Sequence, residues 1–179
     1  MTRLTARSLH RLLSPVLFIV VGVSAVTGLA FRVGKKWFGV DGQTGEAIME
    51  IHTGEWIGGW ASPFYVLLAG TALLFLVFTG LSMLAKGRPR GAVRLWHRVL
   101  GGVLLLPLAA TATTGMIYQV GHSWFAMSEE TSDLLMTIHE GAWLGKNLKV
   151  YYVLVTAFGL LALGLSGLKL IAPRKAPRV

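Results

Sequence analysis

Four apolar segments, each about 20 residues long and almost free of charge, dominate the sequence: Leu12–Phe31, Phe64–Leu84, Val99–Tyr118 and Val150–Ile171. As helix, a segment of that length crosses roughly 30 Å of hydrocarbon. We therefore predict transmembrane helices over about residues 8–33, 62–86, 93–119 and 148–171, and an all-α four-helix membrane bundle. Residues 1–179 would form a single membrane domain, because the spans leave no room for a separate soluble one.

The polar stretches between these segments differ in length. A short basic turn around Gly87–Gly91 joins the second and third segments, and it breaks the chain. Each of the other two loops carries spaced apolar residues ahead of a histidine, so we predict a short amphipathic helix at the membrane interface in each. The first of these loops begins with Asp41–Gly45, a composition typical of a turn.

Charge placement orients the predicted helices. Only 14% of the residues are charged, against about 25% in soluble domains. Twelve of the 17 bases lie at the termini or around the central turn, and all eight acids lie with the other five bases in the two long loops. The positive-inside rule then puts both termini and the central turn in the cytoplasm. We expect a multi-pass protein, in a bacterial inner membrane. The basic balance suits lipid headgroups, and we expect no nucleic-acid partner.

The chain also repeats itself. An offset of 87 residues aligns 8–84 with 95–171 without a gap, and it places His10-Arg11 on His97-Arg98 and His52 on His139. The first apolar segment follows three arginines as a signal peptide would, but its copy is internal, so we predict a retained helix. Each copy holds two crossings, which predicts a parallel repeat with a pseudo-two-fold axis along the membrane normal.

Helical spacing puts both N-terminal histidines of the repeat on inward faces. Steps of four and three from His10 and from His97 reach small, aliphatic and hydroxyl residues and end at Gly28 and Gly115. Small and hydroxyl residues are typical of packed membrane interfaces. The symmetry then pairs His10 with His97 near the cytoplasmic side, and His52 with His139 on the outer side.

Two opposed imidazoles are the axial ligand set of a haem iron. We therefore predict two bis-histidine b-type haems, with His10, His97, His52 and His139 as metal ligands. Arg11 and Arg98 would meet the propionates of the inner haem, with Lys146 and Lys149 as weaker candidates outside. The absence of cysteine excludes iron–sulfur clusters, thiolate sites and covalently attached c-type haem.

Several alternatives stay open. Zinc or copper would need a further ligand, such as Glu55 or Glu140. Histidines also relay protons or simply pack between helices, and Thr27-Gly28 with Thr114-Gly115 fit close helix packing. We interpret His122, which aligns with Lys35, as an ordinary interface residue.

The opening Ser8–Leu13, the segment Val40–Ala47 followed by Ile51-His52, and the recurrence of Ile138-His139 resemble the PepSY-associated transmembrane family. This resemblance implies b-type haem at the four histidines and transmembrane electron transfer, as in ferric-siderophore reductases. The loops are too short for a folded PepSY domain, which places siderophore specificity in doubt.

The leading hypothesis is a di-haem cytochrome b that carries electrons across a lipid bilayer. No nucleophile–base pair or phosphate loop is evident, so any enzymatic role would be as an oxidoreductase subunit in ferric or quinol-linked reduction. Donor and acceptor would be redox proteins or a quinone. The rival is a non-redox scaffold or assembly factor, and a third arrangement places one haem between the protomers of a homodimer.

Overall fold

The computed structural model describes residues 5–84, 87 and 89–172, and the regular secondary structure of the described part is all helical. Four long helices form the body: α1 (Ala6–Trp37), α3 (Ser62–Leu84), α4 (Ala92–Trp124) and α6 (Lys149–Ile171). All four are long and apolar enough to cross a membrane. Two shorter helices, α2 (Gly42–Thr53) and α5 (Glu129–His139), fill the long loops, each followed by a 3₁₀ turn, Glu55–Ile57 and Ala142–Leu144.

The four long helices surround a common interior. Both α1 and α4 pack against α3 and α6, which leaves α1 and α4 diagonally opposed. Side chains from all four helices meet in the middle of the bundle, where Val21, Leu73, Leu104, Leu108 and Leu160 are buried. Most of these residues lie on the inward faces that the helical spacing predicted for α1 and α4.

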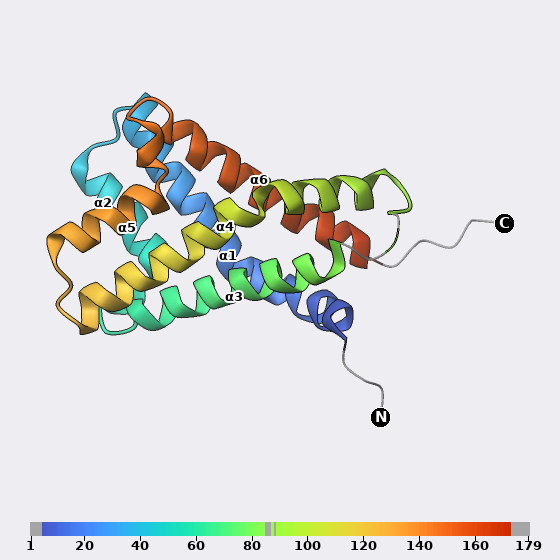
Figure 1. The fold of residues 1–179 in the computed structure, drawn as a ribbon. Coiled ribbons are helices and arrows are strands. Elements are labelled where there is room, and N and C mark those ends of the chain that lie inside the picture. Colours follow the sequence, from blue (N-terminus) through green and yellow to red (C-terminus); the bar gives the residue numbers. More distant parts are fainter. Residues whose placement is uncertain (1–4, 85–86, 88, 173–179) are drawn as a thin grey trace.

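The two short helices lie together at one end of the bundle. α2 packs on α1 and α5 packs on α4, and Figure 1 shows both at the end opposite the α3–α4 connection. The beginning of α1 and the end of α6 lie at the same end as that connection. His52 and His139 are thereby carried to one end, and His10 and His97 lie toward the other.

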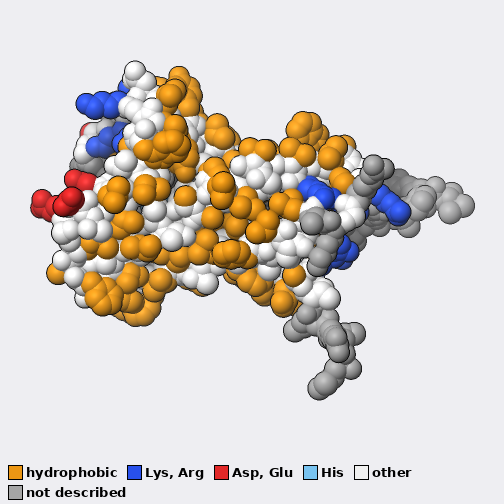
Figure 2. Space-filling model, viewed as in Figure 1, with side chains coloured by type: hydrophobic (Ala, Val, Ile, Leu, Met, Phe, Trp, Pro, Cys, Tyr) orange, Lys and Arg blue, Asp and Glu red, His pale blue; other side chains and the backbone are white. Residues whose placement is uncertain are grey.

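The outer surface of the body suits a bilayer. Large apolar side chains are exposed on every long helix, among them Ile19, Phe78, Leu106 and Leu165. Figure 2 shows hydrophobic atoms spread over the side of the body, while the charged atoms in view gather at its two ends. Apolar flanks between charged ends are the surface of a multi-pass membrane protein.

The structure corrects the prediction of a turn over Asp41–Gly45. Gly42–Gly45 form the first turn of α2, and Asp41 is its N-cap, whose carboxylate accepts a hydrogen bond from the Thr44 N–H at 2.7 Å. Aspartate and glycine are common in turns and also at helix starts, so composition alone did not separate the two. α1 and α4 also run farther outward than predicted, because their last turns are polar and extend beyond the apolar segment.

Candidate functional site: two histidine pairs

The structure brings His52 and His139 together. Their ring centroids are 6.4 Å apart, with an angle of 76° between the ring planes. His52 is near the end of α2 and His139 is the last residue of α5. Both side chains point back into the bundle, where Gly28 of α1 and Gly115 of α4 lie beside them. The predicted outer pairing is therefore the observed one.

Hydrogen bonds fix the tautomer of both outer histidines. Nδ1 of His52 lies 2.9 Å from the Ser24 carbonyl oxygen, and Nδ1 of His139 lies 2.9 Å from that of Thr111. A carbonyl oxygen can only accept, so each Nδ1 carries the proton. In a neutral ring Nε2 then holds a free lone pair. Burial lowers the pKa of His52 to about 4, and burial also lowers the pKa of His139, so both rings are neutral at pH 7.

Two glycines make room for these rings. A Cβ atom on Gly115 would lie 2.8 Å from Cε1 of His139, and a Cβ on Gly28 would lie 3.1 Å from Cε1 of His52. The threonines before them, Thr27 and Thr114, place their hydroxyl oxygens 3.2 and 3.5 Å from the Nδ1 atoms of His52 and His139. In this structure the Thr-Gly pairs contact the histidines, as well as lying at the packed interior of the bundle.

The chain reverses direction immediately beyond each outer histidine. Gly54 and Gly141 have φ values of +80° and +70°, a conformation that favours glycine. Tyr65 and Tyr152 pack against these glycines, with their hydroxyl groups 3.4 and 3.2 Å from the side-chain oxygens of Ser24 and Thr111. Each short helix is thus held where its histidine enters the bundle.

A cavity of about 220 Å³ lies between the outer histidines and the core. Its walls are mainly apolar and come from all four long helices and both short ones. Residues on its walls include Val21, Ser24, Gly28, Leu108, Thr111 and Gly115. The diagonal placement of α1 and α4 keeps this space open between them.

The inner histidines have matching partners. Nδ1 of His10 lies 2.7 Å from the hydroxyl oxygen of Thr79, and Nδ1 of His97 lies 2.8 Å from that of Ser166. Each hydroxyl donates its proton to a carbonyl of its own helix, at Phe75 and Leu163 respectively. Each hydroxyl therefore accepts from Nδ1, and Nε2 is again left free.

The separation of the outer ring centres is close to that of two imidazoles bound to a single metal ion. A metal–imidazole bond is about 2.0 Å long and a ring nitrogen lies about 1.1 Å from its ring centre, so two such rings have centres about 6 Å apart. Within the described residues, no three His, Cys, Asp or Glu side chains converge. The pair thus offers two ligands and an apolar surround, which suits haem better than zinc or copper.

The two predicted propionate partners are placed differently. Arg11 is exposed. The Arg98 guanidinium donates to the backbone carbonyl oxygens of Leu84 and Gly87, at the end of α3. Arg98 therefore holds the α3–α4 connection in this structure, and a role of either arginine toward a cofactor stays a prediction.

His122 stacks on Tyr118, with ring centroids 5.8 Å apart.

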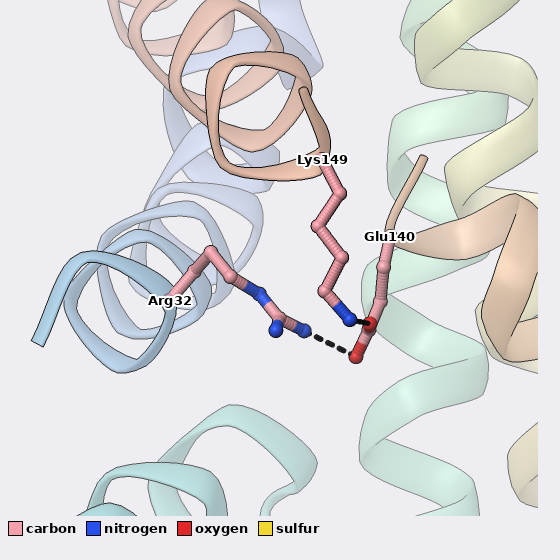
Figure 3. A network of polar contacts seen from close by, with 3 residues as sticks. All are labelled: Arg32, Glu140 and Lys149. Atoms are coloured by element: carbon pink, nitrogen blue, oxygen red, sulfur yellow. Dashed lines mark hydrogen bonds and ion pairs between the residues drawn. The ribbon is translucent and has the colours of Figure 1, made fainter. Parts of the chain in front are cut away.

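Sequence reasoning missed a charged cluster beside the outer pair. Glu140, the residue after His139, forms ion pairs with Arg32 of α1 and with Lys149 of α6, the latter at 2.5 Å (Figure 3). Arg32 and Glu140 also line the histidine cavity. The cluster depends on the packing of α1 on α6, which the repeat did not predict.

No family model, no curated protein and no solved structure matches this chain. The resemblance to the PepSY-associated transmembrane family stays a prediction.

Proposed function

We propose that this chain is a transmembrane electron carrier that holds two b-type haems, one between His52 and His139 and one between His10 and His97. The observation that carries the proposal is the outer pair: two neutral imidazoles from different helices, 6.4 Å apart, at an apolar cavity. Both Nδ1 atoms are engaged by carbonyl oxygens, so both Nε2 atoms are available for a metal.

The inner pair extends the argument to a second cofactor. His10 and His97 occupy equivalent places on α1 and α4, and each has a hydroxyl partner on Nδ1, Thr79 of α3 for His10 and Ser166 of α6 for His97. Each of these contacts recurs after 87 residues, as do the contacts of the outer pair. Such recurrence supports the proposed parallel repeat about an axis along the membrane normal.

The residues of the chain would bind and orient the cofactor. Haem, when bound, supplies one-electron redox chemistry. The hydrogen bonds to Nδ1 orient each imidazole and raise its strength as a ligand. The mainly apolar walls of the outer cavity would surround the cofactor. The redox donor and acceptor would be supplied by partner proteins or a quinone at the two faces of a bacterial inner membrane, with both termini on the cytoplasmic side.

The test is a visible spectrum of the protein purified after expression with ample haem. We expect a reduced-minus-oxidised spectrum of low-spin haem b and about two haems per chain. One haem per chain, together with a homodimer in solution, would favour a haem shared between protomers. A colourless protein that folds normally would refute the proposal and leave the scaffold or assembly-factor alternative, in which the hydrogen-bonded histidines serve packing alone.

A further inference from the structure

All five basic residues of the outer loops and helix ends lie at one corner of the bundle. Arg32, Lys35 and Lys36 come from the last turns of α1, Lys149 is the first residue of α6, and Lys146 lies in the loop just before it. Together with Val150 they line a cleft of about 170 Å³. Because α1 packs directly on α6, two groups of cations that are distant in sequence face one another across this cleft.

Acidic side chains neutralise little of this charge. Among the described residues, the ion pairs that these five cations make both go to Glu140. Glu140 joins Arg32 to Lys149 (Figure 3). Lys35, Lys36 and Lys146 form no ion pair within that part of the chain. Five positive charges against one negative charge leave a surplus around a space large enough for a small ion.

The corresponding corner of the other half of the repeat, called the neutral corner below, has no Lys, Arg, Asp or Glu at the matching positions. The residues 87 positions away from the five cations are Gln119, His122, Ser123, Gly59 and Ser62. There the Gln119 amide donates to the Ser62 hydroxyl at 2.9 Å, and Ser62 donates to the Thr53 carbonyl oxygen at 2.9 Å. Ser62 and Gln119 are buried. The α3–α4 corner is thus filled by hydrogen bonds between uncharged groups. The α1–α6 corner instead contains an open cleft lined by five cations.

Structural needs alone do not account for this difference. The counterpart corner joins α4 to α3, the helices equivalent to α1 and α6 in the repeat, without any Lys or Arg at these positions. Packing of such a helix pair therefore does not by itself require five cations. Concentrating like charges costs free energy unless an anion balances them. We propose that the cleft lined by Arg32, Lys35, Lys36, Lys146 and Lys149 is a binding site for a small multivalent anion that bears phosphate or carboxylate groups.

Glu140 would compete for this site. Its carboxylate already contacts Arg32, which also lines the histidine cavity, and Lys149. An incoming anion takes over these charge-assisted hydrogen bonds, and Glu140 is displaced. Glu140 directly follows His139. An anion bound in the cleft would therefore displace a side chain that adjoins the outer histidine pair. Binding to the cleft itself does not depend on haem.

The test uses the full chain in nanodiscs of zwitterionic phosphatidylcholine, with inorganic pyrophosphate titrated by calorimetry. We expect saturable binding that weakens as KCl is raised. Arg32→Gln with Lys149→Ser, which copies the neutral corner, should weaken binding by about tenfold or more. Glu140→Gln should tighten binding several-fold. Arg94→Gln removes one exposed cation at the opposite end and should leave the affinity unchanged.

Two further measurements separate lost binding from misfolding, and a soluble anion from a lipid phosphate. Lys36→Ser with Lys146→Gln alters exposed side chains alone, so weaker binding there cannot come from misfolding. A second set of nanodiscs contains anionic phosphatidylglycerol. Pyrophosphate binding that persists there indicates a soluble anion, and binding lost only there indicates that lipid phosphate occupies the cleft. No binding in zwitterionic discs, or equal affinity in wild type and the cleft variants, overturns the proposal.

Discussion

Each outer histidine is held by the backbone and side chains of a long helix rather than by its own short helix. For His139 these are the Thr111 carbonyl oxygen, the Thr114 hydroxyl and Gly115, whose missing side chain leaves room for the ring. His52 has the same three contacts from Ser24, Thr27 and Gly28. The ring position is therefore set by α1 and α4, which makes substitutions on those helices a test of ligand geometry.

Replacing Gly115 by alanine should disturb the outer site without removing either histidine. The added Cβ would lie 2.8 Å from Cε1 of His139, so the ring has to move. We expect Gly115→Ala to lower haem occupancy or to change the low-spin signal of one haem in electron paramagnetic resonance.

Gly102→Ala is the matched control for that experiment, because a Cβ at Gly102 meets no atom within 4 Å. In a helix interior this exchange generally adds up to about 1 kcal/mol of stability. Haem content should therefore match wild type in Gly102→Ala. Equal spectra for the two variants would contradict a tight fit around His139.

Removing an outer imidazole should halve the cofactor content. His139→Ala leaves His52 as a single ligand, so the chain should retain about one haem, measured as haem per chain by pyridine haemochrome absorbance. His122→Ala removes a histidine that stacks on Tyr118 and should keep both haems. Loss of haem from His122→Ala alone, with His139→Ala unaffected, would reverse the assignment.

The two short helices are equivalent in position but begin with different caps. Asp41 caps α2 and Ser128 caps α5, and each side chain accepts a hydrogen bond from the N–H three residues on. The Thr44 N–H holds the pKa of Asp41 below its ordinary value of 3.8, with a second contribution from the Thr44 hydroxyl. The stabilisation of α2 is therefore complete above the ordinary pKa and is lost as the pH falls through the lowered one.

Amide hydrogen exchange should reveal this difference between the short helices. As the pH falls from 6 toward 3, the protection of α2 amides should decrease because the Asp41 carboxylate becomes protonated. The Ser128 hydroxyl does not titrate in this range, so the cap of α5 should cause no such decrease. Asp41→Ala should remove the pH dependence of α2. Ser128→Ala should lower protection of α5 by about 1 kcal/mol at every pH. An α2 that keeps equal protection at both ends of this range would contradict the role of Asp41.

The elements differ in how far the sequence predicted them. Uniformly apolar segments predicted the four spans, and the spaced apolar residues before His52 and His139 predicted α2 and α5. The start of α2 was missed because Asp41 and the glycines after it suit a turn as well as a helix cap. The outer pairing was predicted because the repeat related one histidine to the other.

The cationic corner needed the tertiary structure. Arg32 and Glu140 are 108 positions apart, and only the packing of α1, α5 and α6 brings them together. The sequence did contain one signal, since the repeat aligns Arg32 with Gln119 and Lys149 with Ser62. In both pairs a cation in one half of the outer end aligns with a neutral residue in the other half. This charge difference indicates where the outer site departs from the symmetry of the repeat.

At the scale of the whole molecule, the order of the helices fixes which ends share a side. α2 and α5 lie at one end, and the α3–α4 connection lies at the other with the beginning of α1 (Figure 1). In a membrane the basic connection should face the cytoplasm and the acid-rich end should face outward. The outer histidine pair and the cationic cleft would then both face the extracytoplasmic side.

The chain contains no cysteine, so single introduced cysteines report this orientation without background. Glu130→Cys at the start of α5 should react with a membrane-impermeant maleimide on intact spheroplasts. Arg90→Cys in the α3–α4 connection should react only after permeabilisation. Both positions are exposed, so a missing reaction reflects the membrane rather than burial. The reverse pattern would place His52, His139 and the cleft in the cytoplasm, and an anion bound there would have to come from inside the cell.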